Sequence, residues 1–145
     1  MMRSAMPAVH LKANRAKKIP WKNGRGFTHE LAIWPAGATL ARDDFDWRVS
    51  KATVDEPGPF SIFRGFERVL VVTSGDGIVL SHGSSGSSRS RARLRALEPY
   101  RFSGDWPTEA ELAVLGVARV IEEQRRLLTA ARGVGGARFD ADDRV

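Results

Sequence analysis

Short apolar runs that recur every few residues, with turn-forming residues between them, most constrain what this 145-residue chain can fold into. The runs include Leu31–Trp34, Phe45–Ser50 and Val69–Thr73, and Gly, Pro, Asp or Ser residues stand between them. This spacing is typical of β-sandwiches and β-barrels, and differs from that of alternating strands and helices. The pattern therefore predicts an all-β fold.

Side chains alternate within these runs, and the alternation divides polar from apolar residues. In the run 45–50, Phe45, Trp47 and Val49 share one face, while Arg48 and Ser50 share the other. We interpret the tryptophan-bearing face as the core side of a strand. Arg48 then lies on the opposite, defined side of the sheet.

Three punctuated segments complete the β pattern. Residues 74–77, Ser-Gly-Asp-Gly, lie between Val69–Thr73 and Ile78–Leu80 and predict a β-hairpin. Residues 81–93 are rich in Ser, Gly and Arg and predict a mobile loop. Pro99 predicts that the strand around Phe102 lies at a sheet edge or begins after the proline.

Composition indicates a soluble protein of a reducing compartment. The chain has no cysteine, which excludes disulfides, thiolate metal sites and cysteine nucleophiles. No apolar run approaches the ~20 residues that cross a bilayer, and the first residues lack the apolar core of a signal peptide. We therefore expect a cytoplasmic location and no membrane partner.

The net charge of +6 is concentrated at the front of the chain, where residues 1–30 carry seven basic residues and one acidic residue. A nucleic-acid binder would spread Lys and Arg along a face and place stacking aromatic residues among them. The basic cluster Lys12–Lys18 contains no aromatic residue. This argues against nucleic acid as a partner and favours a solvated basic strand.

An ordered set of short motifs resembles a known family. The set comprises Trp21–Gly24 with Thr28 and Glu30 downstream, Trp47–Ser50, Gly58–Phe63, Arg68 before the next strand, and Phe102–Asp105. In this order the motifs are similar to those of the HutD/Ves family of small cupin-like proteins, over roughly residues 8–116. The resemblance implies a cytoplasmic cupin-like β-barrel or sandwich that is linked to histidine utilisation or stress response and suspected of binding a small acidic metabolite such as formylglutamate.

The tail departs from both the strand pattern and the family. Val117, Val120, Ile121, Leu127 and Leu128 recur at helical spacing, which predicts an amphipathic helix that stops near Gly133. We therefore divide the chain into a cupin-like domain at 8–116 and a divergent helical tail at 117–145. Two explanations stay open: a shortened branch that caps its barrel with a helix, or a reading frame that shifted near Gly116.

The candidate binding residues are polar side chains placed by turns and strand alternation. An amide in a Gly-flanked turn and a pair that shares one strand face can point at a ligand. A buried glutamate there needs a partner, and Arg48 and Lys22 are the two candidates. A guanidinium offers a planar fork suited to a carboxylate. The predicted ligand-binding set is Asn23, Thr28, Glu30, Arg48 and Arg68.

Residues for metal or nucleophilic chemistry are not found in a suitable pattern. His10, His29 and His82 are far apart in sequence, His82 falls in the predicted loop, and no His-x-His pair is present. No Gly-x-Ser-x-Gly motif occurs, and no serine has an identifiable histidine partner. We assign no catalytic residue, metal ligand or cofactor.

The sequence thus predicts a protein that binds a small anionic metabolite without transforming it. Two alternatives stay open. One is a metal-independent isomerase or hydrolase that uses Glu30 as a general base. The other is a structural homodimer without a ligand, held through an exposed strand edge.

Overall fold

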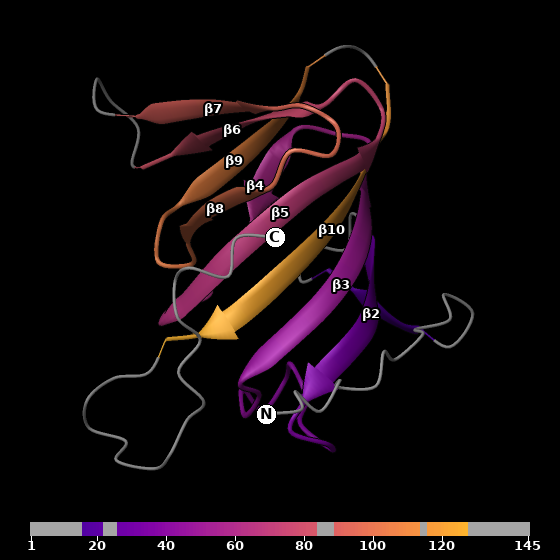
Figure 1. The fold of residues 1–145 in the computed structure, drawn as a ribbon, viewed down its shortest axis with the longest axis vertical. Helices are drawn as coiled ribbons and strands as arrows, with labels where there is room; N and C mark the ends of the chain where they lie inside the picture. Colours follow the sequence, from indigo (N-terminus) through magenta and orange to yellow (C-terminus); the bar gives the residue numbers. More distant parts are fainter. Residues whose placement is uncertain (1–15, 22–25, 84–88, 114–115, 128–145) are drawn as a thin grey trace, which may run out of the picture.

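The computed structural model describes residues 16–21, 26–83, 89–113 and 116–127, which form two packed β-sheets with antiparallel strand pairs (Figure 1). The six-stranded sheet contains, in spatial order, β1 (Lys17–Pro20), β2 (Phe27–Trp34), β3 (Trp47–Val54), β10 (Ala118–Arg126), β5 (Phe66–Ser74) and β8 (Tyr100–Ser103). The four-stranded sheet contains β4 (Gly58–Phe60), β9 (Thr108–Leu112), β6 (Ile78–His82) and β7 (Ser90–Leu94). The predicted all-β class is confirmed for the described residues.

The predicted C-terminal helix is wrong over residues 118–126. These residues form β10, which lies between β3 and β5 and pairs with both along most of its length (Figure 1). Alternation decides this, because Ala118, Val120, Glu122 and Gln124 are all buried while Ile121 is exposed. The rest of the predicted helix, 128–133, lies outside the described residues. Among the described residues there is no helix, and hence none long and apolar enough to cross a membrane.

The predicted hairpin at 74–77 is also wrong, because β5 and β6 belong to different sheets. The turn carries the chain from one sheet to the other. Gly75 and Gly77 both have positive φ, of 98° and 97°, and a Cβ on either would lie within 2.5 Å of a backbone oxygen. The glycines are therefore required by close backbone approach at a corner between sheets.

The core lies between the two sheets and is apolar towards this corner. Leu70, Val72 and Val120 of the six-stranded sheet pack in one cluster with Ile78 and Leu80 of the four-stranded sheet. Each such side chain contributes about 1.5–3 kcal/mol when fully buried. A second, smaller cluster contains the buried residues Ala38, Phe45 and Phe66.

The buried face of β3 is the reverse of the predicted one. Arg48, Ser50 and Val54 are buried against the opposite sheet, whereas Trp47 and Val49 are only half-buried on the outer face. Strand alternation was therefore read correctly, but the polar side of the strand faces inward. A sheet that buries arginine and serine on its inner face needs partners for them there.

Two local expectations have different outcomes. β8 begins directly after Pro99 and is an edge strand, as predicted. The predicted loop at 81–93 is wrong at both ends, because Ser81 and His82 complete β6 and residues 90–94 form β7. Residues 84–88 lie outside the described part of the chain.

Candidate functional site

A cavity of about 1040 Å³ opens between the two sheets beside the apolar core, whose Leu70 and Val120 are part of its lining. Its floor is the inner face of β2, β3, β10 and β5, and its roof includes Pro59 and Phe60 of β4 with the residues that follow. Among the described residues, five basic and three acidic side chains line it: Lys17, Lys18, Arg48, Arg64 and Arg68, and Glu30, Asp43 and Glu122. The volume suits a small metabolite, and the charge balance favours an anion.

Strand register places the charged side chains of the floor in two adjacent rows. One row runs across three strands, because Gln124 of β10 is opposite both Arg48 of β3 and Arg68 of β5. In the next row Ser50 of β3 is opposite both Glu30 of β2 and Glu122 of β10. Basic and acidic residues from distant parts of the chain thus lie in contact because four neighbouring antiparallel strands are in register.

Arg48 is held in the floor by two hydrogen bonds. Its Nε donates to Glu30 Oε2 at 2.9 Å, and its Nη1 donates to Gln124 Oε1 at 3.0 Å. The residue is only 3% exposed, so its charge depends on these partners. Arg48 is one of the two partners that the sequence offered for Glu30, and the other, Lys22, lies outside the described residues.

Arg68 is as buried as Arg48, and all three of its guanidinium nitrogens are hydrogen-bonded. Its Nε and Nη2 both donate to Glu122 Oε1, at 2.9 and 2.5 Å, and its Nη1 donates to the carbonyl oxygen of Ser61 at 2.7 Å. Three aromatic rings, those of Phe60, Phe63 and Phe102, lie 5.0–5.5 Å from its guanidinium carbon. Arg68 is therefore an anchor, fixed by a carboxylate and by cation–π contacts.

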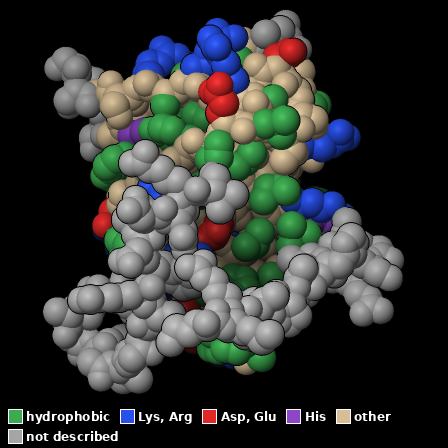
Figure 2. Space-filling view, in the orientation of Figure 1, with side chains coloured by type: hydrophobic (Ala, Val, Ile, Leu, Met, Phe, Trp, Pro, Cys, Tyr) green, Lys and Arg blue, Asp and Glu red, His purple; other side chains and the backbone are tan. Residues whose placement is uncertain are grey.

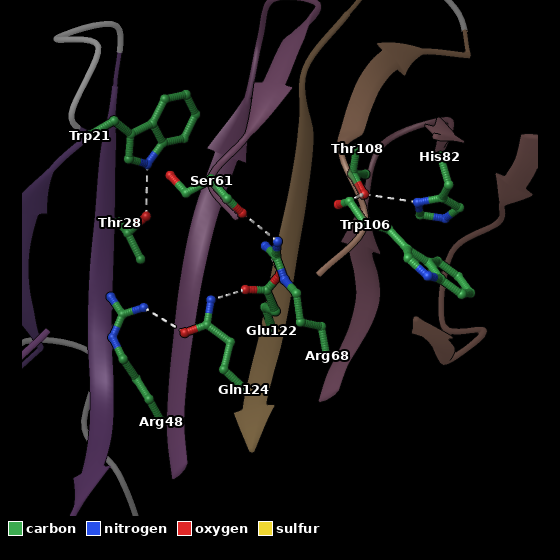
Figure 3. A network of polar contacts seen from close by, with 10 residues as sticks. All are labelled: Trp21, Thr28, Arg48, Ser61, Arg68, His82, Trp106, Thr108, Glu122 and Gln124. Carbon is green, nitrogen blue, oxygen red and sulfur yellow. Dashed lines mark hydrogen bonds and ion pairs between the residues drawn. The ribbon is translucent and has the colours of Figure 1, made fainter. Parts of the chain in front are cut away.

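Gln124 joins the two ion pairs into one network (Figure 3). Its Oε1 accepts from Arg48, and its Nε2 donates to Glu122 Oε2 at 2.5 Å. Both ends of its amide are thereby oriented, and the residue is 2% exposed. The hydrogen bonds are continuous from Glu30 to the carbonyl oxygen of Ser61. A substitution of Arg48 or Arg68 would therefore alter the hydrogen bonds of the other arginine through Gln124.

Trp21 and Thr28 form part of the cavity wall near β1. The indole Nε1 of Trp21 donates to Thr28 Oγ1 at 2.7 Å, and both residues line the cavity (Figure 3). The ring of Trp21 lies so close to Gly26 that a Cβ there would meet it at 2.9 Å. Glycine at 26 therefore allows the tryptophan to fold back over the strand.

The structure brings four of the five predicted binding residues together. Thr28, Glu30, Arg48 and Arg68 all line the cavity, and the fifth, Asn23, lies outside the described residues. Sequence reasoning missed Glu122 and Gln124, because the segment was interpreted as a helix. A signal did exist: two buried arginines require two buried carboxylates, and only Glu30 had been identified.

The donors left free on the floor belong mainly to Arg48. Within the described part of the chain, its Nη2 makes no hydrogen bond, whereas each nitrogen of Arg68 makes one. Lys17 also lines the cavity and forms no ion pair with a described residue. A ligand carboxylate would therefore meet Arg48 from the floor and Lys17 from the rim.

A second buried polar cluster lies outside the cavity, around His82. His82 Nδ1 is 2.9 Å from Thr108 Oγ1, and Nε2 is 2.9 Å from the hydroxyl of Tyr100. Thr108 donates its hydroxyl hydrogen to the carbonyl of Trp106 at 3.0 Å, so it must accept from His82. Nδ1 therefore carries the proton, and the neutral ring accepts from Tyr100 at Nε2.

Burial, followed by the positive charge of Arg68, holds the pKa of His82 below its ordinary value. Burial also raises the pKa of the Tyr100 hydroxyl. The rings of Tyr100, Phe102 and Trp106 lie 5.0–5.7 Å from that of His82. The cluster is thus a neutral, aromatic-walled connection between the two sheets, and the placement of His82 in a mobile loop is wrong.

Metal binding has no geometric support in the part of the chain that is described. No group of three or more His, Cys, Asp or Glu side chains there could hold an ion. Both nitrogens of His82 are already hydrogen-bonded. Glu30 and Glu122 are each paired with an arginine.

Comparison with known proteins places the chain in a family. The model of the HutD family matches residues 13–120. The chain belongs to the HutD family. An uncharacterized 21.2 kDa protein in the hutC 3' region of Pseudomonas putida is 36% identical over 102 residues, which are 70% of this chain and 50% of that protein. Protein Ves of Citrobacter koseri is 34% identical over 100 residues, 67% of this chain and 48% of Ves.

A solved structure agrees with this assignment. The structure of HutD from Pseudomonas fluorescens SBW25 superimposes with a TM-score of 0.66 at 34% identity, over 80% of this chain and 59% of that one. The resemblance to the HutD/Ves family is thus confirmed. The chain spans about half the length of the curated relatives it matches.

Proposed function

We propose that this HutD-family chain binds a small anionic metabolite in the cavity between its sheets, with Arg48 as the principal ligand-binding residue. The observation that carries the proposal is the excess of basic side chains around a cavity whose floor presents a free guanidinium edge. Glu30 orients Arg48 through its hydrogen bond, and Thr28 and Arg68 form part of the cavity lining. Asn23 remains a predicted member, and the ligand is not covalently changed.

The relatives suggest the metabolic setting of the ligand. The Pseudomonas putida relative is named for its position beside hutC, and the Pseudomonas fluorescens relative is named HutD. We extend this to the present chain and propose a formylglutamate-like ligand of histidine utilisation. A carboxylate with an amide N–H matches a floor that offers both guanidinium donors and carboxylate acceptors.

The ion pair of Glu30 supports binding over the enzymatic alternative. A general base must reach the proton that it removes, and Glu30 Oε2 is committed to Arg48 at 2.9 Å. A carboxylate held in this way orients its guanidinium. The alternative of a homodimer that binds no ligand does not explain why charged side chains line the floor of the cavity.

Isothermal titration with formylglutamate, glutamate and succinate tests the proposal. Arg48→Lys keeps the charge but removes the planar fork, and it should weaken binding of the best ligand by about tenfold or more, the range of a charge-assisted hydrogen bond. The matched control is Arg119→Lys on β10, an exposed residue on the outer face, which should leave the affinity unchanged.

Circular dichroism establishes that each variant is folded. Equal affinities for wild type and Arg48→Lys would remove Arg48 from the site. The proposed function would be contradicted if the folded wild type bound none of the three anions at about 10 mM. A dissociation constant above that concentration is weaker than that of almost any specific site.

A further inference from the structure

The four outer edges of the two sheets are not equally open to an additional strand. Pro20 ends β1, Pro59 lies within β4, and Pro99 directly precedes β8. Proline has no N–H to donate, and it commonly blocks strand addition at an edge. β7 has five residues, no proline, and among the described residues pairs only with β6. Among the described strands, the outer edge of β7 is therefore the one with no strand partner and no proline in or beside it, and we call it the open edge.

The open edge carries a row of arginines. Arg89, Arg91, Arg93 and Arg95 alternate with residues that turn inward, of which Leu94 is buried and Ala92 half-buried. Basic side chains gather at the upper margin of Figure 2, where Figure 1 places β6 and β7. The edge therefore combines backbone groups without a strand partner and a strong positive charge.

The carboxylates of the sheet neutralise only part of this row. Arg89 pairs with Glu109 and Arg91 with Glu111, both at 3.1 Å, and both acidic residues belong to β9. Arg93 and Arg95 form no ion pair with any described residue. Nε of Arg89 is buried without an acceptor in the described structure. Donors and charge are thus left over along one side of the sheet.

We propose that the open edge of β7 binds an extended acidic peptide segment of a partner protein as an added strand. The peptide backbone pairs with β7, and alternate acidic side chains meet Arg91 and Arg93, which share one face. Main-chain hydrogen bonds give this mode its affinity, and the arginine row gives it a preference for acidic sequences.

The charge of the edge selects this occupant. A second copy of β7 would bring two arginine rows together, which disfavours self-association. A nucleic acid would need stacking surfaces among the basic residues, and β7 itself, Ser-Arg-Ala-Arg-Leu, contains no aromatic residue. A strand with acidic side chains satisfies both the backbone and the arginines.

The test measures fluorescence anisotropy of a labelled peptide, Glu-Val-Glu-Val-Glu-Val, with the purified chain. The matched probe has the same sequence with every backbone nitrogen methylated, so that it keeps the charge but has no N–H to donate along either edge. Wild type should bind the first peptide at least about tenfold more tightly than the second, the equivalent of losing one or two backbone hydrogen bonds.

Variants separate the arginine row from general charge. Arg93→Ser should weaken peptide binding by about threefold, as expected for an exposed charge contact, and Arg93→Lys should restore it. The control Arg101→Ser removes an exposed arginine of β8, in the other sheet, and should have no effect. Circular dichroism establishes that the variants are folded.

Three results would overturn the proposal. The methylated peptide could bind as tightly as its parent, or a hexathymidylate could bind as tightly as the peptide, and either would show attraction by charge alone. No binding of the acidic peptide at about 1 mM in low salt, where surface electrostatics are strongest, would exclude the edge as a docking surface.

Discussion

The two buried polar clusters of this protein differ in charge, packing and access. The cluster of Arg48, Glu122, Gln124 and their partners is ionic and forms the floor of a cavity. The cluster around His82 is neutral and surrounded by aromatic rings. Polar groups are buried in both places, but only the first leaves donors facing open space.

The two clusters also differ in what their burial contributes to stability. Buried ion pairs recover little more than the cost of removing two charges from water, so apolar residues of similar volume would often be as stable. A neutral chain of hydrogen bonds carries a smaller desolvation cost and directly connects the two sheets. The charged floor is therefore consistent with the binding function proposed above, whereas the histidine cluster is expected to contribute to stability.

The largest effect is expected when the charged floor loses one partner. Glu122→Gln leaves Arg68 buried with its positive charge uncompensated, and it should lower the free energy of unfolding by about 3–5 kcal/mol. Glu123→Gln is the matched control on the same strand, because Glu123 faces outward and its ion pair with Arg125 is partly exposed. That variant should cost under about 1 kcal/mol.

Urea denaturation of both variants measures this pair. Similar losses would mean that the inner carboxylate is no more important than a surface one. The contrast between the charged floor and the rest of the sheet would then fail.

A smaller effect is expected in the histidine cluster. Thr108→Val keeps the shape but removes the acceptor for His82 Nδ1 and the donor to the Trp106 carbonyl, and it should cost about 1–3 kcal/mol. The control Thr73→Val removes an exposed hydroxyl that also donates to a backbone carbonyl, at 3.2 Å. It should change stability by under about 0.5 kcal/mol. A loss no larger in Thr108→Val than in Thr73→Val would show that the cluster is not a stabilising element.

The smallest effect concerns one proton on His82. Because the pKa of His82 is lower in the folded protein than its ordinary value of 6.5, the unfolded chain binds more protons between those two values. The contribution of His82 to the free energy of unfolding is therefore fully present above about pH 6.5. It decreases as the pH falls from there towards the pKa of His82 in the folded protein. His82→Gln removes this contribution while keeping His10 and His29.

Unfolding free energies at pH 7.5 and 5.5, measured for wild type and His82→Gln, give the comparison. Wild type should lose more stability on acidification than the variant does. Parallel pH profiles would show that His82 is not held neutral by its surroundings.

Sequence reasoning recovered the β class and named four residues that line one cavity, for identifiable reasons. Thr28 and Glu30 were placed correctly because strand alternation is strict over two residues. Arg48 was placed on the correct side of its strand relative to Trp47, although the buried side was misjudged. Alternation assigns residues to faces, but the assignment of a face to the interior depends on what the opposite sheet provides.

β10 and His82 were missed because local sequence misrepresents their surroundings. Glu122 and Gln124 replace the apolar residues that a buried strand would normally show, and this allows a helical reading of the remaining apolar positions. His82 stands beside a Ser- and Gly-rich stretch, yet its burial depends on Tyr100, Phe102 and Trp106 from later in the chain. Contacts of this range are not encoded in a local window.

The central position of β10 has a consequence for the order in which the protein can fold. β3 and β5 are both synthesised before β10, and they join the same sheet only when it inserts between them. Until then a nascent chain exposes two unpaired strand edges, and Arg68 lacks the carboxylate of Glu122. Such a topology closes late and slowly, and it is open to mispairing during synthesis. Completion of the binding floor and completion of the sheet are thus a single event.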